Sequence, residues 1–187
     1  MSERTDFTVG RKDWGDSRVE SCPAGELGDG QVRMQVERFA LTSNNISYAA
    51  AGDMLKYWGF FPAAEGRGRI PAMGFGDVIE SKHDEIPVGT RVFGFFPMSR
   101  YLVLEPSSAS PARIVDGASH RKGLAPVYNE YSPVGGDPNY SASQEDEHML
   151  MRGLFMTSFL AEDLIADNDL FGAGAVLITS ASDRKST

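Results

Sequence analysis

Apolar and polar residues alternate in the first part of the chain, as they do in strands that bury one face. Residues 7–9 and 32–36 show this alternation, and the glycine-rich segment 25–30 between them is typical of a turn region. Further strands are predicted over 74–80 and 88–96, where apolar residues mix with glycine, and over the short apolar run 101–104. Short strands separated by glycine and proline turns predict an all-β barrel or sandwich.

A short helix is predicted to follow the strand that ends near Leu41. The run Thr42-Ser-Asn-Asn45 carries local hydrogen-bonding side chains, which are typical of turns and helix N-caps. The helix is expected over residues 46–58, interrupted near Gly52. Its shared face would hold Ile46, Ala50, Met54 and Leu55. Residues 67–69, further on, are expected to form a loop.

The clearest helix is predicted over residues 143–168, after a loop-rich segment at 105–142. Ser143 is a candidate N-cap, and three acidic residues follow it, where the positive end of the helix dipole favours them. Apolar residues then recur at helical spacing, which is typical of core packing. These residues are Leu150, Met151, Leu154, Phe155, Phe159, Leu160 and Leu164.

A segment of a different kind closes the sequence. Residues 172–179 form a nearly continuous apolar run with β-branched side chains, as in a parallel strand buried on both faces. The hydroxyl-rich, basic residues 180–187 follow, and a strand that enters such a loop begins a phosphate-binding site. We therefore expect a barrel domain over 1–142, a linking helix over 143–169, and the start of an incomplete nucleotide-binding domain over 170–187.

Composition and charge narrow the class of protein. The chain has 187 residues, of which 41% are hydrophobic and 24% charged, as in soluble globular proteins. A net charge of -8 argues against a nucleic-acid partner. Cys22 is the only cysteine, which excludes an intramolecular disulfide and fits a reducing compartment. No signal peptide is seen, and residues 149–160 are too short and too polar to span a bilayer, so we expect a cytoplasmic protein without a membrane partner.

Two polar clusters interrupt the apolar segments between residues 39 and 97. One consists of the amides and hydroxyls of residues 42–45, and the other contains Tyr57 and Trp58. Buried amides are unfavourable unless they are paired, so this stretch is a candidate functional site. The alternative is a capped, partly buried helix whose asparagines satisfy backbone groups, and the residues alone leave both interpretations open.

The order of several segments resembles a known enzyme superfamily. A β-rich first half is followed by 74–80, 88–94, a linking helix and 176–180, in the order of the medium-chain dehydrogenase/reductase superfamily. The resemblance is greatest to its zinc-free quinone- and enoyl-reductase-like branch. Within that branch it is greatest to a subfamily whose signatures are Leu41–Tyr48, Tyr57–Pro62, Tyr128–Tyr131 and Ser180–Ser182.

The resemblance implies a fold that is mainly β with some α, a GroES-like β-barrel followed by the first strand of a truncated Rossmann domain. Zinc-binding members carry a cysteine and a Gly-His-Glu where this chain has residues 42–45 and 74–76, which contain neither thiol nor imidazole. Cys22 and the scattered histidines lack the spacing of a zinc site, so no metal is expected. A zinc-free reductase must bind the substrate oxygen with hydrogen-bond donors instead.

The resemblance also implies roles for residues on the substrate side. Asn44 or Asn45 would donate to the substrate oxygen or hold the nicotinamide amide, and Tyr48 or Tyr57 would supply a proton. The aromatic residues Trp58, Phe60 and Phe61 would form the wall for a flat, apolar carbonyl or quinone-like substrate.

On the cofactor side, the resemblance implies NADP(H), with contacts from Thr42, Ser180, Ser182, Arg184 and Lys185. Related reductases carry a glycine-rich turn after the corresponding strand, whereas residues 180–187 contain no glycine. Side chains there hinder close approach of the backbone to a pyrophosphate. We therefore expect weak nucleotide binding, and no dehydrogenase activity from these 187 residues alone.

A second function remains open. The chain could be a non-catalytic module that binds a small apolar ligand or a partner and dimerises through its last strand. An exposed apolar edge strand at 176–179 would favour such pairing. A homodimer is compatible with both functions, since reductases of this superfamily also pair through their sheets.

Overall fold

Ten β-strands lie between Glu3 and Pro133 in the computed structural model, which describes residues 3–177. The chain divides into two compact units, Met1–Ala142 and Ser143–Thr187. The first unit holds all the strands of the described residues, together with one short α-helix. The expectation of a mainly β fold with some α is confirmed.

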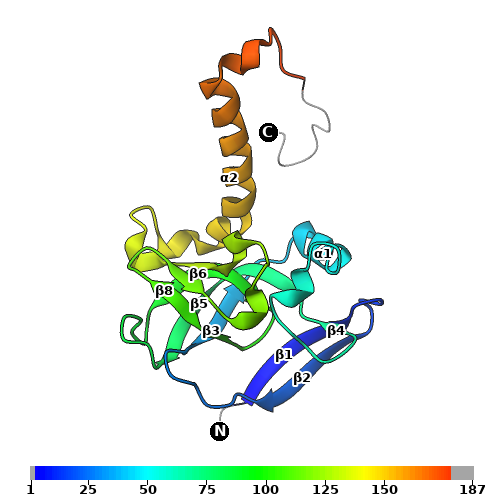
Figure 1. The fold of residues 1–187 in the computed structure, drawn as a ribbon, viewed down its shortest axis with the longest axis vertical. Coiled ribbons are helices and arrows are strands. Elements are labelled where there is room, and N and C mark those ends of the chain that lie inside the picture. Colours follow the sequence, from blue (N-terminus) through cyan, green and yellow to red (C-terminus); the bar gives the residue numbers. More distant parts are fainter. Residues whose placement is uncertain (1–2, 178–187) are drawn as a thin grey trace. The chain divides into compact units, whose positions relative to one another are not determined.

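The larger sheet of the first unit has seven antiparallel strands in the order β7-β3-β5-β6-β10-β9-β8. It curls into a half-barrel, in which β3, β5 and β6 lie side by side (Figure 1). Two register shifts in the β3–β5 ladder help to bend it, as bulges do. The strands are β3 (Val32–Phe39), β5 (Pro71–Ser81), β6 (Arg91–Pro97), β7 (Tyr101–Leu104), β8 (Pro106–Ala109), β9 (Ile114–Asp116) and β10 (Glu130–Pro133).

The smaller sheet has the order β2-β1-β4, with β1 over Glu3–Gly10, β2 over Ser17–Pro23 and β4 over Arg67–Gly68. The prediction of a loop at 67–69 was therefore wrong for its first two residues. Arg67 belongs to this sheet because its guanidinium donates to the Thr8 carbonyl oxygen (2.9 Å) and to the Asp16 carboxylate (2.8 Å). Strand β2 was not predicted, because nearly all its residues are exposed and its sequence does not alternate.

The loop-rich prediction for 105–142 missed β8, β9 and β10. Each of these strands has only three or four residues, too few to show a period of two. Between them lie the 3-10 turns η2 (Ser119–Arg121) and η3 (Pro126–Asn129), and η4 (Val134–Gly136) follows β10. These short elements carry much of the candidate site described below.

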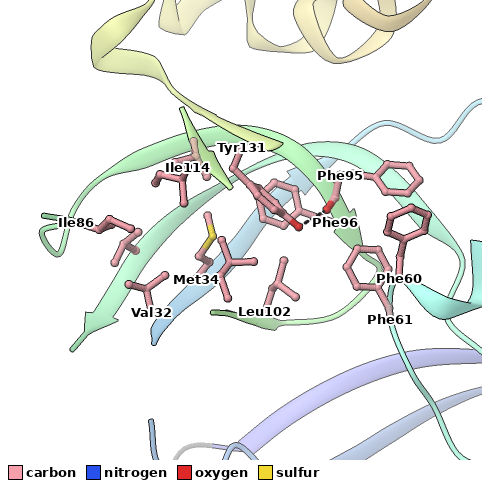
Figure 2. Packing of buried hydrophobic residues seen from close by; sticks show 13 residues of the cluster. Val32, Met34, Phe60, Phe61, Ile86, Phe95, Phe96, Leu102, Ile114 and Tyr131 are labelled. Carbon is pink, nitrogen blue, oxygen red and sulfur yellow. Dashed lines mark hydrogen bonds between the residues drawn. The ribbon is translucent and has the colours of Figure 1, made fainter. Parts of the chain in front are cut away.

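The hydrophobic core of the first unit lies against the concave larger sheet. Figure 2 shows Phe60, Phe61 and Phe95 gathered at one end of this core, and Val32 and Ile86 at the other. Tyr131 lies between them, fully buried, and its hydroxyl donates to the Phe95 carbonyl oxygen at 2.8 Å.

The helix predicted over 46–58 is shorter than expected. Helix α1 spans Ser43–Ala50, and the chain then turns before the 3-10 turn η1 (Tyr57–Gly59). The residues expected to share a face, Ile46, Ala50, Met54 and Leu55, are all exposed, whereas Asn45 and Ala49 are the buried residues of α1. The helix ends where Trp58 packs against the backbone: a Cβ at Gly52 would lie 2.2 Å from the indole ring. Burial of this indole therefore determines the path of the backbone between α1 and η1.

The second unit contains helix α2 (Glu145–Asp167), which confirms the predicted helix. Its N-cap is Gln144, not Ser143, and the Gln144 side chain makes no capping hydrogen bond. The apolar stripe was predicted to be core, but most of it is exposed, with Phe155 at 62%. None of the helices in the described residues is long and apolar enough to cross a membrane.

After α2, the 3-10 turn η6 spans Asp169–Gly172. Residues 173–177 form no strand, so the predicted strand is absent from the part of it that the structure describes. The end of that strand and the predicted phosphate loop at 180–187 lie outside the described residues.

Candidate functional site

Three tyrosines from separate elements meet on the first unit. Tyr48 comes from α1, Tyr57 from η1 and Tyr128 from η3. The ring centroids of Tyr48 and Tyr57 are 4.8 Å apart, and those of Tyr57 and Tyr128 are 5.8 Å apart. All three side chains are half-buried. We call this group the tyrosine cluster.

Buried phenylalanines form the floor of the tyrosine cluster. Phe95 on β6 stacks on Tyr128 at 4.2 Å between centroids and meets the Tyr48 ring edge-on at 5.3 Å. Phe60 packs edge-on against both Phe95 (5.6 Å) and Tyr128 (5.5 Å). The floor is apolar and the rim carries three phenol groups, which is the composition expected of a small-molecule site.

Burial changes the acidity of these phenols. It raises the pKa of Tyr57 to about 12, and hydrogen bonding to Tyr128 adds to the rise. Burial likewise raises the pKa of Tyr48 and of Tyr128. The three hydroxyls therefore stay protonated at neutral pH and can donate hydrogen bonds.

Spectrophotometric titration at 295 nm should show tyrosines that ionise late. Burial raises the pKa of Tyr131 to about 12, from an ordinary value of about 10. A raised folded-state pKa contributes stability below the unfolded pKa, and this contribution is lost as pH rises through the folded value. We therefore expect stability to fall as the pH rises from about 10 toward 12. The late absorbance step should shrink in Tyr131→Phe, and a step unchanged by that substitution would contradict the assignment.

A buried ion pair lies behind the cluster and connects its elements. The Nε atom of Arg121 lies 2.7 Å from Oδ2 of Asp116, and both side chains are 1% exposed. Arg121 also donates to the Tyr128 carbonyl oxygen at 3.2 Å and to the Tyr131 hydroxyl at 3.1 Å. Because Tyr131 in turn donates to the Phe95 carbonyl oxygen, one guanidinium links β9, η3, β10 and β6. It thereby positions Tyr128 over Phe95.

The predicted asparagines occupy different environments. Asn45 accepts from the Thr42 N–H at 2.6 Å and donates to the Pro71 carbonyl oxygen at 2.8 Å, while Thr42 Oγ1 accepts from the Asn44 N–H at 3.2 Å. For Asn45 this is the capping arrangement that the sequence left open as an alternative. The Asn44 side chain is half-buried, and among the described residues it makes no hydrogen bond.

The predicted aromatic wall divides between two places. Phe60 belongs to the floor of the tyrosine cluster, and the ring centroids of Phe61 and Phe95 are 6.1 Å apart. Trp58 instead packs with Val9 and Ala49 in a separate apolar cluster. The structure thus brings Tyr48 and Tyr57 together as candidate donors and places Trp58 elsewhere.

Of the residues predicted to contact the cofactor, only Thr42 is described, and its hydroxyl serves as the helix cap. Ser180, Ser182, Arg184 and Lys185 lie outside the described residues. Within residues 3–177, no group of three or more His, Cys, Asp or Glu side chains is placed to hold a metal ion.

Sequence reasoning did not assign Tyr128, Arg121 or Asp116 to the site. The signature Tyr128–Tyr131 marked the neighbourhood, but it lay in a segment without periodicity. No local pattern distinguishes Arg121 from a solvated arginine, because its carboxylate partner is defined only by folding.

The sequence matches the model of a protein family. The profile of the family described as "Protein of unknown function (DUF2855)" matches residues 39–187. No curated protein matches the sequence.

Solved structures show distant similarity. CurA from Vibrio vulnificus has 14% identity, a TM-score of 0.41, and coverage of 58% of this chain and 32% of its own. The quinone oxidoreductase from Coxiella burnetii has 18% identity and a TM-score of 0.39, and the match covers 68% of this chain and 40% of the oxidoreductase. The human synaptic vesicle membrane protein VAT-1 homolog-like protein has 13% identity and a TM-score of 0.38, and the match covers 78% of this chain and 39% of the human protein. The matches span only 32% to 40% of the length of these structures.

Proposed function

This chain belongs to the DUF2855 family of proteins of unknown function, and we propose that it carries the substrate-side domain of a zinc-independent, NAD(P)H-dependent oxidoreductase of the quinone- or enone-reductase type. The observation that carries the proposal is the tyrosine cluster, in which three protonated phenols meet above an apolar floor. The resemblance of the signatures around residues 41–48, 57–62 and 128–131 to zinc-free reductases supports it.

The chemistry of the cluster suits a flat, electron-poor carbonyl compound. The ring of a quinone would lie on apolar surface, and its oxygen would meet the phenol groups. When such a substrate receives a hydride, which the nicotinamide supplies when bound, negative charge develops on that oxygen. Fixed hydrogen-bond donors stabilise such charge because they need no reorganisation.

Within this proposal the residues have separate roles. Tyr48 and Tyr57 donate hydrogen bonds to the substrate oxygen, and their raised pKa values make them donors rather than bases. Asn44 is a further candidate donor, because its amide is not used in the helix cap. Asn45 acts as a positioning residue, since its amide holds the start of α1 to the Pro71 carbonyl oxygen.

Binding of duroquinone tests the assignment. This quinone is fully substituted, so it does not readily add to the Cys22 thiol. We expect calorimetry to detect binding of duroquinone to the 187-residue chain. Tyr48→Phe or Tyr57→Phe should each weaken this binding by about tenfold, because one hydrogen bond is lost. Tyr140→Phe is the matched control, because Tyr140 packs near Phe75, outside the cluster. Unchanged affinity in both cluster variants would show that these hydroxyls do not contact the quinone.

A second candidate function is a non-catalytic ligand-binding or interaction module. The exposed apolar residues of α2, which include Phe155, Phe159 and Leu164, favour it because large exposed apolar patches often mark interaction sites. Light scattering of the chain addresses this candidate, and a monomer would weaken it.

A further inference from the structure

A second site lies apart from the rim of the tyrosine cluster. A cavity of about 120 Å³ in the first unit is lined by four arginines and a histidine, Arg4, Arg33, Arg69, Arg121 and His120, alongside apolar residues. No carboxylate lines it. The arginines come from β1, β3, the segment between β4 and β5, and η2. Folding therefore gathers positive charge from four distant parts of the sequence.

Two of these arginines are neutralised by their own carboxylates. The Arg33 Nε atom lies 2.9 Å from the Glu80 carboxylate, and its two Nη atoms donate to the carbonyl oxygens of Ala24 and Gly25. Arg121 is paired with Asp116, as described above. The charges of these two guanidiniums are therefore already compensated.

Arg4 and Arg69 share a single carboxylate. Asp6 lies 2.9 Å from Arg4 Nη2 through one oxygen and 3.4 Å from Arg69 Nη1 through the other. Four guanidiniums thus face three carboxylates, which leaves one positive charge in excess. Arg69 is only 8% exposed, and a buried charge without a counter-charge is unfavourable.

Two guanidinium nitrogens at this cavity also have N–H groups that are not fully used in hydrogen bonds. The Nε atom of Arg4 is buried and has no hydrogen-bond partner in the described part of the chain. Arg69 Nη1 makes only long contacts, 3.4 Å to Asp6 and 3.5 Å to Ser99 Oγ. Burial lowers the pKa of the Arg69 guanidinium, as expected where the charged form lacks full compensation.

We propose that this cavity binds a small tetrahedral oxyanion, a free phosphate ion or the terminal phosphate of a phosphomonoester, between Arg4 and Arg69. Arginine is well suited to this ligand because its planar guanidinium offers paired donors to phosphate oxygens. The volume admits a phosphate group and excludes a dinucleotide. The site does not depend on the proposed reductase function.

The test uses inorganic phosphate and the full chain, in a buffer without other polyvalent anions and at constant ionic strength. We expect saturable binding of one phosphate per chain by calorimetry. Arg4→Gln should weaken it by about tenfold or more, because one charge-assisted contact is lost. Arg4 is partly exposed on β1, so this variant is expected to fold.

Arg18→Gln is the matched control. It removes the same charge from the neighbouring strand β2, where the Arg18 side chain is 57% exposed and pairs with Asp16. Its affinity for phosphate should stay close to that of the wild type. Equal losses in both variants, or no saturable binding at millimolar phosphate, would overturn the proposal.

A parallel titration with phenyl phosphate identifies the source of the ligand. Comparable affinity would assign the cavity to the terminal phosphate of a phosphomonoester. Binding of inorganic phosphate alone would assign it to the free ion. In either case the amide NMR signals of Arg69 and His120 should shift on binding, and binding that leaves both signals unmoved would place the anion elsewhere.

Discussion

Replacement of Asp116 with alanine should lower the free energy of unfolding by about 3–5 kcal/mol, because it leaves the Arg121 guanidinium buried without a counter-charge. The same carboxylate accepts from the backbone N–H groups of Glu105 (3.1 Å) and Ala118 (3.0 Å), and these donors would also lose their partner. Urea unfolding followed by circular dichroism measures the loss.

An exposed ion pair provides the control for Asp116→Ala. The side chains of Arg113 and Glu130 are 57% and 42% exposed, so Glu130→Ala should change stability by less than about 1 kcal/mol. A double variant, Asp116→Leu with Arg121→Met, should recover part of the loss, since it removes both charges. Equal effects of Asp116→Ala and Glu130→Ala would mean that the pair does not organise this region.

Replacement of Phe95 with alanine should also destabilise the protein by about 3–5 kcal/mol. Phe95 is 1% exposed, and its ring packs against Tyr48, Tyr57, Tyr128, Phe60 and Phe61. Its loss would leave a cavity beneath the tyrosine cluster, so quinone binding should fall together with stability. Thermal and urea unfolding measure the first effect, and calorimetry with duroquinone measures the second.

Phe155→Ala is the matched control for this substitution. Phe155 lies on α2 and is 62% exposed, so the same change in side chain should alter stability by no more than about 0.5 kcal/mol. A loss as large as that of Phe95→Ala would show that the α2 stripe is covered in solution. That result would favour the interaction module over the reductase.

Both large effects converge on one feature of the molecule. Asp116 holds Arg121, Arg121 holds the backbone of Tyr128 and the hydroxyl of Tyr131, and Tyr131 donates to the Phe95 carbonyl oxygen. This series of buried polar contacts therefore sets the position of the aromatic groups at the proposed substrate site.

The elements that could be predicted from the sequence are those whose signal is local. Alternation marked β3 and part of β1, and helical spacing marked α2. The run of hydroxyl and amide residues at 42–45 marked the start of α1, whose N-cap is Thr42. Each of these signals is contained within a few consecutive residues, so no knowledge of distant partners was needed.

The features that were missed or predicted wrongly depend instead on contacts between residues far apart in the sequence. The apolar residues near α1 did not indicate its buried positions, which are Asn45 and Ala49. The Asn45 amide donates to the Pro71 carbonyl oxygen, and Ala49 packs with Val9 and Trp58. Strand β4 exists because Arg67 finds partners 59 and 51 residues away, on Thr8 and Asp16. Such contacts leave no trace in local periodicity.

The sequence by itself therefore determined the β-rich first unit, the long helix after it, and two of the tyrosines, because residue type and spacing carry that information. Only the tertiary structure decided that Tyr128 joins Tyr48 and Tyr57, that Arg121 holds Tyr128 in place, and that Arg4 and Arg69 share one carboxylate. These arrangements join residues up to 80 positions apart, from Tyr48 to Tyr128. The pairing of distant charges and rings depends on how the sheet curls, which no short stretch of sequence encodes.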